Sequence, residues 1–364
     1  MTEPTASVRK VGAAEAVQLA ADGYRVLDVR QQSEWDAGHI PGATLLPLPE
    51  LPSRMAQLLP DRDEAVLVHC AVGARSARAS AYLAANGYTR VANLDASLDA
   101  WRAAGGAWEA PPQPLTEEQR QRYGRQLLLP EVGVEGQRRL LAARVLVVGA
   151  GGLGSPAALY LAAAGIGSIG LLDDDVVELS NLQRQVLHAT GRIGQAKTVS
   201  GRAALEALNP GVVVVEHAER LEAANVERLL AGYDVIVDGS DRFETRYLIN
   251  DAAVALRRPV VHASVYRWEG QVTTLVPFDG PCYRCLHPAP PPEELAPACD
   301  IAGVMGTLPG IAGTLQANEV IKLVLGVGEP LVGRLLLIDA KSGEFREIHA
   351  ARDPQCPACG DGVA

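Results

Sequence analysis

Short apolar runs alternate with longer amphipathic stretches along this 364-residue chain, a pattern that predicts strands and helices in turn. Such alternation favours mostly parallel sheets with helices packed on them. The later apolar segments are predicted to be antiparallel additions to a sheet. The predicted strands are Arg25–Val29, Ala65–His69, Arg144–Val148, Ser168–Leu172, Val212–Glu216, Asp234–Val237 and Pro259–Ala263, with antiparallel Gly270–Val276, Arg334–Ile338 and Glu344–Ile348. The predicted helices include Ala74–Asn86, Leu153–Ala164, Gln195–Leu208 and Ala223–Ala231.

A proline-rich segment, Pro111-Pro112-Gln113-Pro114, divides the pattern in two, because neither a helix nor a central strand accommodates it. We therefore predict a small α/β domain at residues 1–110, a linker at 111–117 and a larger domain at 118–364. The larger domain should contain a doubly wound, mostly parallel sheet. A second proline-rich stretch, Pro288 to Pro297, predicts a mobile crossing loop.

The uncharged stretch from Val145 to Leu172 is long enough to cross a bilayer, but its seven glycines and Pro156 break it into strand-, helix- and strand-sized pieces. A buried β-α-β unit explains it better than a membrane span. The formal net charge of −10 gives no reason to expect nucleic acid or an anionic membrane as partner. The N-terminus lacks the apolar core of a signal peptide, so we expect a cytoplasmic protein with reduced thiols.

Four of the six cysteines form two Cys-x2-Cys pairs, Cys282 with Cys285 and Cys356 with Cys359, separated by 70 residues. Four thiolates are the set that a closed, structural Zn²⁺ site needs. His287 is a conceivable further ligand, although four cysteines already complete the shell. Redox chemistry of the pairs, or coincidence, are the alternatives.

Cys70 ends a predicted strand and begins the sequence Cys-Ala-Val-Gly-Ala-Arg75-Ser, which leads into a helix. A loop between a strand end and a helix N-terminus directs backbone N–H groups at one point, which lowers the pKa of a thiol there. The alternative is a small buried residue with no chemistry. Arg75 follows Cys70 at the spacing Cys-x4-Arg and would bring a positive charge to the same loop.

The glycines Gly149, Gly151, Gly152 and Gly154 lie between a strand and a helix, and Asp173 follows Gly154 by 19 residues. This pattern predicts a nucleotide site, with the phosphates on the glycine turn and Asp173 near the ribose, without choosing between NAD and ATP.

Polar residues further along favour ATP. Arg184 and Lys197 are two cations suited to a triphosphate, and Asp241 is a candidate Mg²⁺ ligand. Asn181 belongs to the same polar cluster. The alternatives are that Asn181 caps a helix and that the two cations are solvated.

Residues 8–108 resemble the rhodanese family of sulfurtransferases in Asp28-Val-Arg30, in Glu34-Trp-Asp-Ala-Gly-His-Ile-Pro-Gly-Ala43 and in the Cys70 loop. The resemblance implies that Cys70 carries a persulfide in the loop that ends at Arg75. The Cys-x4-Arg loop is one residue shorter than the Cys-x5-Arg cradle of related phosphatases, and this tighter ring suits a persulfide sulfur, which is smaller than a phosphoryl group. We interpret His39 as a structural residue that holds its turn.

Residues 122–360 resemble the HesA/MoeB/ThiF family of adenylating enzymes that activate ubiquitin-like sulfur carriers. The shared motifs are Arg122-Tyr-Gly-Arg125-Gln, the glycine turn, Leu172-Asp173, Ser180-Asn-Leu-Gln-Arg-Gln185, Gly194-Gln-Ala-Lys197, Asp238-Gly-Ser-Asp241, Glu269-Gly-Gln271, Cys282-Tyr-Arg-Cys285 and Gly303-Val304. The resemblance implies that Asp173 binds ribose, that Arg184 and Lys197 bind the triphosphate, and that Asp241 binds Mg²⁺. It further implies that Arg125 reaches into the partner's site of a homodimer, and that Cys299 bonds to the activated carrier or its sulfur.

The two resemblances together imply ATP-dependent adenylation of the carboxylate of a sulfur carrier that ends in Gly-Gly. Sulfur from Cys70, supplied by a donor such as a cysteine desulfurase or thiosulfate, would then give a thiocarboxylate. Carriers of this kind serve molybdopterin, thiamin, tRNA-thiolation and cysteine pathways. The alternatives are an NAD-dependent oxidoreductase, and a zinc-stabilised scaffold that binds a carrier without adenylating it.

Overall fold

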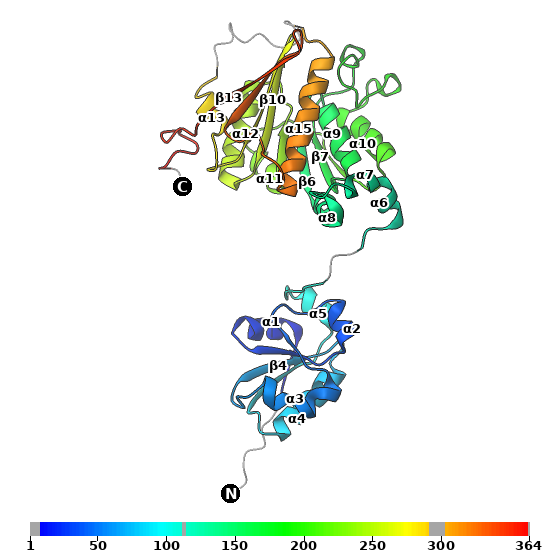
Figure 1. Ribbon diagram of the computed structural model, residues 1–364, viewed down its shortest axis with the longest axis vertical. Helices are drawn as coiled ribbons and strands as arrows, with labels where there is room; N and C mark the ends of the chain where they lie inside the picture. The colour runs from blue at the N-terminus through cyan, green and yellow to red at the C-terminus, as the bar shows by residue number, and fades with distance from the viewer. Residues whose placement is uncertain (1–7, 111–113, 291–302, 363–364) are drawn as a thin grey trace. The chain divides into compact units, whose positions relative to one another are not determined.

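The computed structural model describes residues 8–110, 114–290 and 303–362, and the chain divides into two compact units, Met1–Pro114 and Leu115–Ala364 (Figure 1). Helix α6 (Glu117–Arg122) begins within the predicted linker, because Thr116 caps it by accepting a hydrogen bond from the Gln119 N–H. The predicted crossing loop falls largely on residues 291–302, outside the described ones.

The N-terminal unit contains a five-stranded sheet in the order β1-β5-β4-β2-β3, and all four neighbouring pairs are parallel. On β4, Val66 and Val68 face α3 and α4, whereas Leu67 faces α1 and α5, so helices cover both faces. The elements are β1 (Arg9–Val11), α1 (Ala13–Ala21), β2 (Arg25–Asp28), α2 (Gln32–Asp36), β3 (Thr44–Leu45), η1 (Leu48–Glu50), α3 (Leu51–Leu58), β4 (Ala65–His69), α4 (Ala74–Ala85), β5 (Arg90–Leu94) and α5 (Leu98–Ala103).

The C-terminal unit contains an eight-stranded sheet in the order β13-β12-β11-β10-β9-β6-β7-β8. The strands from β10 to β8 are parallel, and β11, β12 and β13 are antiparallel additions, which confirms the predicted fold class. The elements after α6 are α7 (Gly124–Leu127), α8 (Gly133–Ala142), β6 (Arg144–Val148), α9 (Gly154–Ala164), β7 (Ser168–Leu172), η2 (Leu179–Asn181), η3 (Thr190–Arg192), α10 (Lys197–Leu208), β8 (Val213–His217), α11 (Val226–Ala231), β9 (Val235–Asp238), α12 (Phe243–Leu256), β10 (Val260–Tyr266), β11 (Glu269–Leu275), α13 (Tyr283–Leu286), α15 (Thr307–Leu325), β12 (Arg334–Asp339) and β13 (Glu344–His349).

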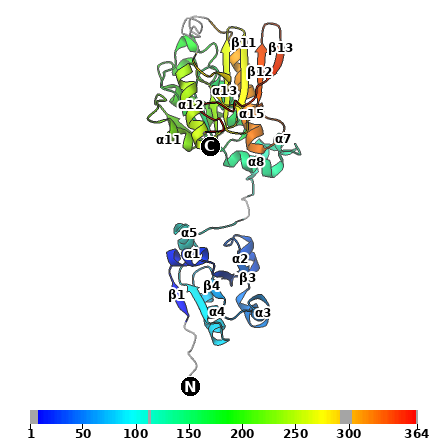
Figure 2. The same ribbon diagram turned by 90° about the vertical axis from the view of Figure 1, so that its left-hand side faces the viewer.

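Alternate residues of β6 separate two apolar layers. Val145 and Val147 pack with α9, α10 and α15, whereas Leu146 and Val148 pack with α11 and α12. Figure 2 labels α15 of the first layer and α11 and α12 of the second. The uncharged stretch 145–172 thus forms β6-α9-β7 and is buried over most of its length, with Tyr160 exposed. Among the described residues no helix combines the length and apolar character that a membrane crossing requires.

Helix α15 packs along α9 and was not foreseen as an element (Figure 1). A Cβ at Gly313 of α15 would lie 2.3 Å from the carbonyl oxygen of Leu153, so the two helices approach more closely than larger side chains allow. Glycines lower the helix propensity of a segment, so the local sequence pattern did not predict α15. Packing against α9 stabilises the helix despite these glycines.

Candidate active sites

The strand order of the larger sheet reverses between β6 and β9, and a cleft lies at the carboxyl ends of these strands. In doubly wound sheets this switch point is where ligands bind. The cleft has about 1120 Å³ of space, part of it open to solvent. It is lined by residues from the glycine loop, the ends of β7 and β9 and the start of α10, among them Gly149, Gly151, Gly152, Asp173, Arg184, Lys197 and Asp241.

The glycine loop passes very close to its neighbours. Gly149 has a φ of +88°, and a Cβ there would lie 3.0 Å from the carbonyl oxygen of Gly239. A Cβ at Gly154 would lie 1.8 Å from the carbonyl oxygen of Gly149. Helix α9 begins at Gly154, and its N-cap residue Leu153 makes no side-chain capping hydrogen bond, so the positive end of the helix dipole suits an anionic ligand.

Asp173 and Lys197 form a buried pair beside this loop. The Asp173 carboxylate accepts hydrogen bonds from the N–H groups of Ala150 (2.8 Å) and Asp175 (2.9 Å). Lys197 is 5% exposed, and its Nζ lies 3.7 Å from Asp173 Oδ1 and 2.8 Å from Asp175 Oδ2. Burial raises the pKa of Asp173, an effect that Lys197 opposes. The pair brings one cation and one acceptor to the place that the sequence predicted for the nucleotide.

The turn after β9 carries Asp241 into the cleft. Asp238 below it is buried and accepts hydrogen bonds from Ser240 Oγ (2.6 Å) and His262 Nδ1 (2.7 Å). Burial raises the pKa of Asp238, but the hydrogen bonds from His262 and Ser240 and the nearby charge of Arg246 together outweigh it and leave the pKa below its usual range. Asp241 itself is exposed, which leaves its carboxylate accessible to a cation.

Three residues predicted for the nucleotide site do not line the cleft of their own chain. Gly154 packs against Gly149 within the glycine loop. The Asn181 Oδ1 accepts a hydrogen bond from the Glu178 N–H (3.2 Å) at the start of η2, which is the capping alternative, and Asn181 is not among the residues lining the cleft. Arg125 is exposed on α7 and likewise does not line the cleft of its own chain. Cys299 falls outside the described residues.

Several residues that contribute to the cleft were not singled out from the sequence. Gln185 is buried beside the glycine loop, and its Oε1 has no partner among the described residues. His188 Nε2 contacts the carbonyl oxygen of Ala150 at 2.9 Å and supports the loop from below. Gln185 is the last residue of the motif Ser180-Asn-Leu-Gln-Arg-Gln185, so the sequence could have identified it. His188 acts only through a tertiary contact, which no local pattern indicates. Further cations in the cleft are Arg220, Arg242 and Arg246.

The two cysteine pairs meet. The sulfurs of Cys282 and Cys356 are 3.6 Å apart and those of Cys285 and Cys359 are 3.4 Å apart, and all four lie within 4.8 Å of one another. Zinc bound to four thiolates at about 2.3 Å holds its sulfurs about 3.8 Å apart, so the set fits Zn²⁺. The Asp353 N–H donates to Cys285 Sγ at 3.4 Å, a contact typical of metal-bound thiolates.

In the N-terminal unit, Cys70 is buried where β4 ends and α4 is about to begin. The Gly73 N–H donates to its Sγ at 3.2 Å. Burial raises the pKa of the Cys70 thiol, but hydrogen bonds from Ser76 and from the N–H groups of Val72 and Gly73 outweigh it, and the pKa falls below its usual range. This environment stabilises a thiolate or a persulfide anion.

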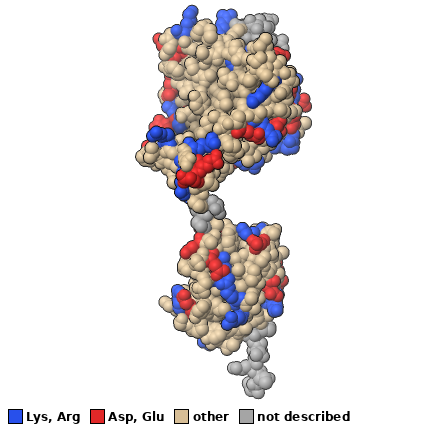
Figure 3. Space-filling model, turned by 90° about the vertical axis from the view of Figure 1, so that its right-hand side faces the viewer, with Lys and Arg blue, Asp and Glu red and all other residues tan. Residues whose placement is uncertain are grey.

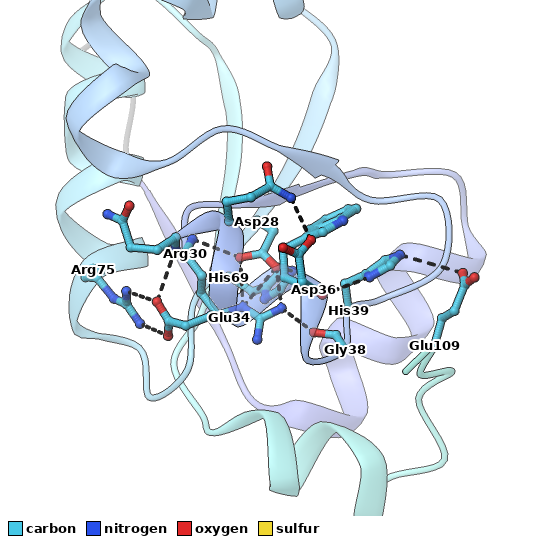
Figure 4. Close-up of polar contacts among 12 residues, drawn as sticks. Asp28, Arg30, Glu34, Asp36, Gly38, His39, His69, Arg75 and Glu109 are labelled. Carbon is cyan, nitrogen blue, oxygen red and sulfur yellow. Dashed lines mark hydrogen bonds and ion pairs between the residues drawn. The ribbon is translucent and has the colours of Figure 1, made fainter. Parts of the chain in front are cut away.

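Arg75, in the first turn of α4, forms two hydrogen bonds with Glu34 of α2 (Figure 4). Nearby, Arg30 is held by Asp28 and by the carbonyl oxygen of Gly38. His39 stacks on Trp35 with ring centroids 3.9 Å apart. The His39 Nδ1 also lies 3.2 Å from the Trp35 carbonyl oxygen, contacts that agree with a structural residue.

A parallel sheet with a glycine loop, cations and an acid at its switch point defines a nucleotide-binding α/β protein, here joined to a unit with a reactive-cysteine loop. Residues 123–358 match the ThiF family and residues 13–104 match the rhodanese-like domain. The chain belongs to the ThiF family and carries a rhodanese-like domain.

Individual relatives agree with this assignment. The chain is 50% identical over 251 residues to the sulfur carrier protein adenylyltransferase of Thermus thermophilus, covering 68% of this chain and 93% of that protein. It is 52% identical over 252 residues to the adenylyltransferase and sulfurtransferase MOCS3 of Bos taurus, covering 69% of this chain and 55% of that protein. Among solved structures, E. coli MccB with ATP has a TM-score of 0.59 at 26% identity, covering 66% of this chain and 75% of that chain.

Proposed function

We propose that the C-terminal unit uses ATP to adenylate the C-terminal carboxylate of a ubiquitin-like sulfur carrier that ends in Gly-Gly, and that Cys70 supplies the sulfur that converts the adenylate into a thiocarboxylate. The observation that carries the first step is the cleft at the switch point, where the glycine loop, Asp173, Arg184, Lys197 and Asp241 converge. The relatives named above are an adenylyltransferase of a sulfur carrier and a protein with both activities. This family membership favours adenylation over hydride transfer to NAD.

The residues of the cleft have distinct tasks in this reaction. Asp173 holds the ribose hydroxyls, and Arg184 and Lys197 neutralise the triphosphate. Asp241 would hold Mg²⁺, which when bound adds further positive charge beside the phosphates. The carrier's carboxylate attacks the α-phosphorus, an acyl-adenylate forms, and pyrophosphate leaves. Because a carboxylate is already a nucleophile, positioning and charge neutralisation suffice, and no general base is required.

The sulfur step uses the two cysteines outside the zinc set. The terminal sulfur of a Cys70 persulfide attacks the acyl carbon of the adenylate, and AMP leaves. A second thiol, which we assign to Cys299, then attacks the Cys70 sulfur. The S–S bond to the carrier breaks, the carrier leaves as a thiocarboxylate, and a disulfide between the two cysteines remains for reduction by cellular thiols.

The remaining partners follow from the same proposal. Cys282, Cys285, Cys356 and Cys359 hold a structural Zn²⁺, because four thiolates leave no open coordination position for catalysis. The enzyme acts as a homodimer, with the exposed Arg125 of one protomer reaching the cleft of the other.

Charges of both signs are interspersed on the face shown in Figure 3, which is unlike a nucleic-acid-binding surface. Reduced cysteines suit the cytoplasm.

ATP–pyrophosphate exchange tests the first step. The purified full-length protein is assayed with each small carrier protein ending in Gly-Gly, and exchange should require one of them with that terminus intact. The Cys70→Ala variant should keep this exchange within about twofold, because Cys70 takes no part in adenylation. It should lose thiocarboxylate formation, measured by the mass of the carrier. Exchange absent with every carrier, despite bound zinc and ATP, would refute adenylation.

A further inference from the structure

Glu34 is placed against the one side-chain cation of the Cys70 loop, Arg75. Arg75 Nη1 donates to Glu34 Oε2 at 2.6 Å and Nη2 donates to Oε1 at 2.7 Å, a two-pronged contact visible in Figure 4. Glu34 is held in turn, because its Oε2 accepts a hydrogen bond from the Gln31 N–H (3.1 Å) at the start of α2. The position of the guanidinium is therefore fixed from outside the loop.

Glu34 and Arg75 both stay charged at neutral pH. The hydrogen bond from Arg75 lowers the pKa of Glu34 to about 2, so Glu34 remains anionic. Arg75 interacts with Cys70 as well as with Glu34, and both raise its pKa. The pair therefore brings one positive and one negative charge to the edge of the loop, and their fields largely cancel for an approaching ion.

Both side chains of the pair remain accessible, with exposed fractions of 33% for Arg75 and 34% for Glu34. An incoming sulfur donor thus meets a neutral ion pair where an unpaired arginine would present a positive charge. A second arginine near this point, Arg30, is buried and paired with Asp28. Arg78 follows Arg75 by one turn of α4 and is exposed. At Cys70 itself, backbone N–H groups and the start of α4 contribute positive potential.

We propose that Glu34 is a specificity-determining residue for the loading of Cys70: by pairing with Arg75 it disfavours dianionic donors such as thiosulfate and favours a hydropersulfide, R–S–SH. The proposal rests on the proposed function of Cys70 as a sulfur carrier. In the favoured reaction the Cys70 thiolate attacks the terminal sulfur of R–S–SH. The S–S bond breaks, R–S⁻ leaves, and the proton stays on the new Cys70–S–SH.

The same attack on thiosulfate gives a Cys70 persulfide anion and releases sulfite, SO₃²⁻. Here an anion attacks a dianion, and no proton on the transferred sulfur reduces the repulsion. This step needs an uncompensated cation near the sulfonate oxygens. Because Glu34 compensates the charge of Arg75, the cation of the loop is not available for this task, and the protein should distinguish the two donors by their charge.

The experiment measures the rate at which the full-length protein gains one sulfur on Cys70, by mass spectrometry, from thiosulfate and from cysteine hydropersulfide. We expect Glu34→Gln to raise the rate constant with thiosulfate by about tenfold, because the charge of Arg75 becomes available. The rate constant with the hydropersulfide should stay within about twofold. The gain with thiosulfate should shrink as ionic strength rises and should vanish in Glu34→Gln combined with Arg75→Gln.

The chain offers a matched control. Arg25 and Glu64 form an ion pair in the same unit with exposed fractions of 33% and 34%, but Glu64 precedes β4 at the end opposite Cys70. Glu64→Gln should change neither rate constant. Equal rate constants for both donors in the wild-type protein, or a parallel change for both in Glu34→Gln, would overturn the proposal. If neither donor loads Cys70, the proposed sulfur-carrying function fails and the inference fails with it.

Discussion

At the scale of single residues, glycines of one loop serve different purposes. Gly154 is required for packing, because a side chain there would meet the carbonyl oxygen of Gly149 at 1.8 Å. Gly151 lines the cleft, and the nearest atom to an added Cβ is Gln185 Nε2 at 3.6 Å, an ordinary contact distance. The protein could therefore accommodate a methyl group at Gly151, whereas a bound phosphate would be displaced by it.

Alanine substitutions separate these two roles. We expect Gly154→Ala to lower the free energy of unfolding by about 1–3 kcal/mol through overpacking. Gly151→Ala should change this free energy by less than about 1 kcal/mol, but weaken ATP binding by about tenfold or more. Thermal unfolding with and without Mg-ATP measures both effects. Undiminished stabilisation of Gly151→Ala by Mg-ATP would show that the loop does not hold the phosphates.

At the scale of elements, the cysteine cluster joins two parts of the C-terminal unit. Cys282 and Cys285 lie at α13, and Cys356 and Cys359 lie in the segment after β13. The pair at α13 is also tied to α12, because the Tyr283 N–H donates to Asn250 Oδ1 at 2.7 Å. Helix α12 begins two residues after Asp241, so a metal in the cluster would stabilise an element that borders the cleft.

A glycine near the C-terminus tests this cluster without removing a sulfur. A Cβ at Gly360 would lie 2.6 Å from the carbonyl oxygens of Cys356 and Pro354. Gly360→Ala should therefore reduce bound zinc well below one ion per chain and lower the thermal midpoint of the C-terminal unit. Gly362→Ala is the matched control, because no atom lies within 4 Å of its added Cβ. Full zinc content in Gly360→Ala, measured by elemental analysis, would contradict the proposed site.

At the scale of the whole molecule, the proposed homodimer means that residues of both chains contribute to each active site. Arg125 is exposed and away from the cleft of its own chain, whereas Lys197 is buried within it. If Arg125 completes the partner's cleft, a chain lacking Arg125 and a chain lacking Lys197 can form one intact site together.

Mixing two inactive variants tests this arrangement. Arg125→Ala and Lys197→Ala should each reduce ATP–pyrophosphate exchange by at least about tenfold. After dissociation and random reassociation in equal amounts, about half of the dimers are mixed and each has one intact site. Exchange should then recover to about one quarter of the wild-type value. No recovery, with mixed dimers verified by mass, would place Arg125 outside the partner's site.

The sequence supported local predictions well. Strands β4, β6 and β7 occur at the predicted residues, because short apolar runs bounded by polar or turn residues admit few other structures. The predicted first residue of α10 lies two residues before the observed one, and that of α11 lies three residues before it. Helix ends depend on contacts outside the local pattern, which explains the difference. Asn181 shows the same dependence, because a polar side chain near a nucleotide motif serves equally well as a cap.

The sequence by itself determined the class of fold, the glycine loop, the family and the cysteine spacing, because these depend on residues close together in the chain. Only the tertiary structure decided which distant residues meet. It brought the two cysteine pairs together, set Glu34 against Arg75 across 41 positions, and placed the end of β9 beside the glycine loop. The physical reason is that such contacts form when whole sheets and helices pack, and no local pattern specifies them.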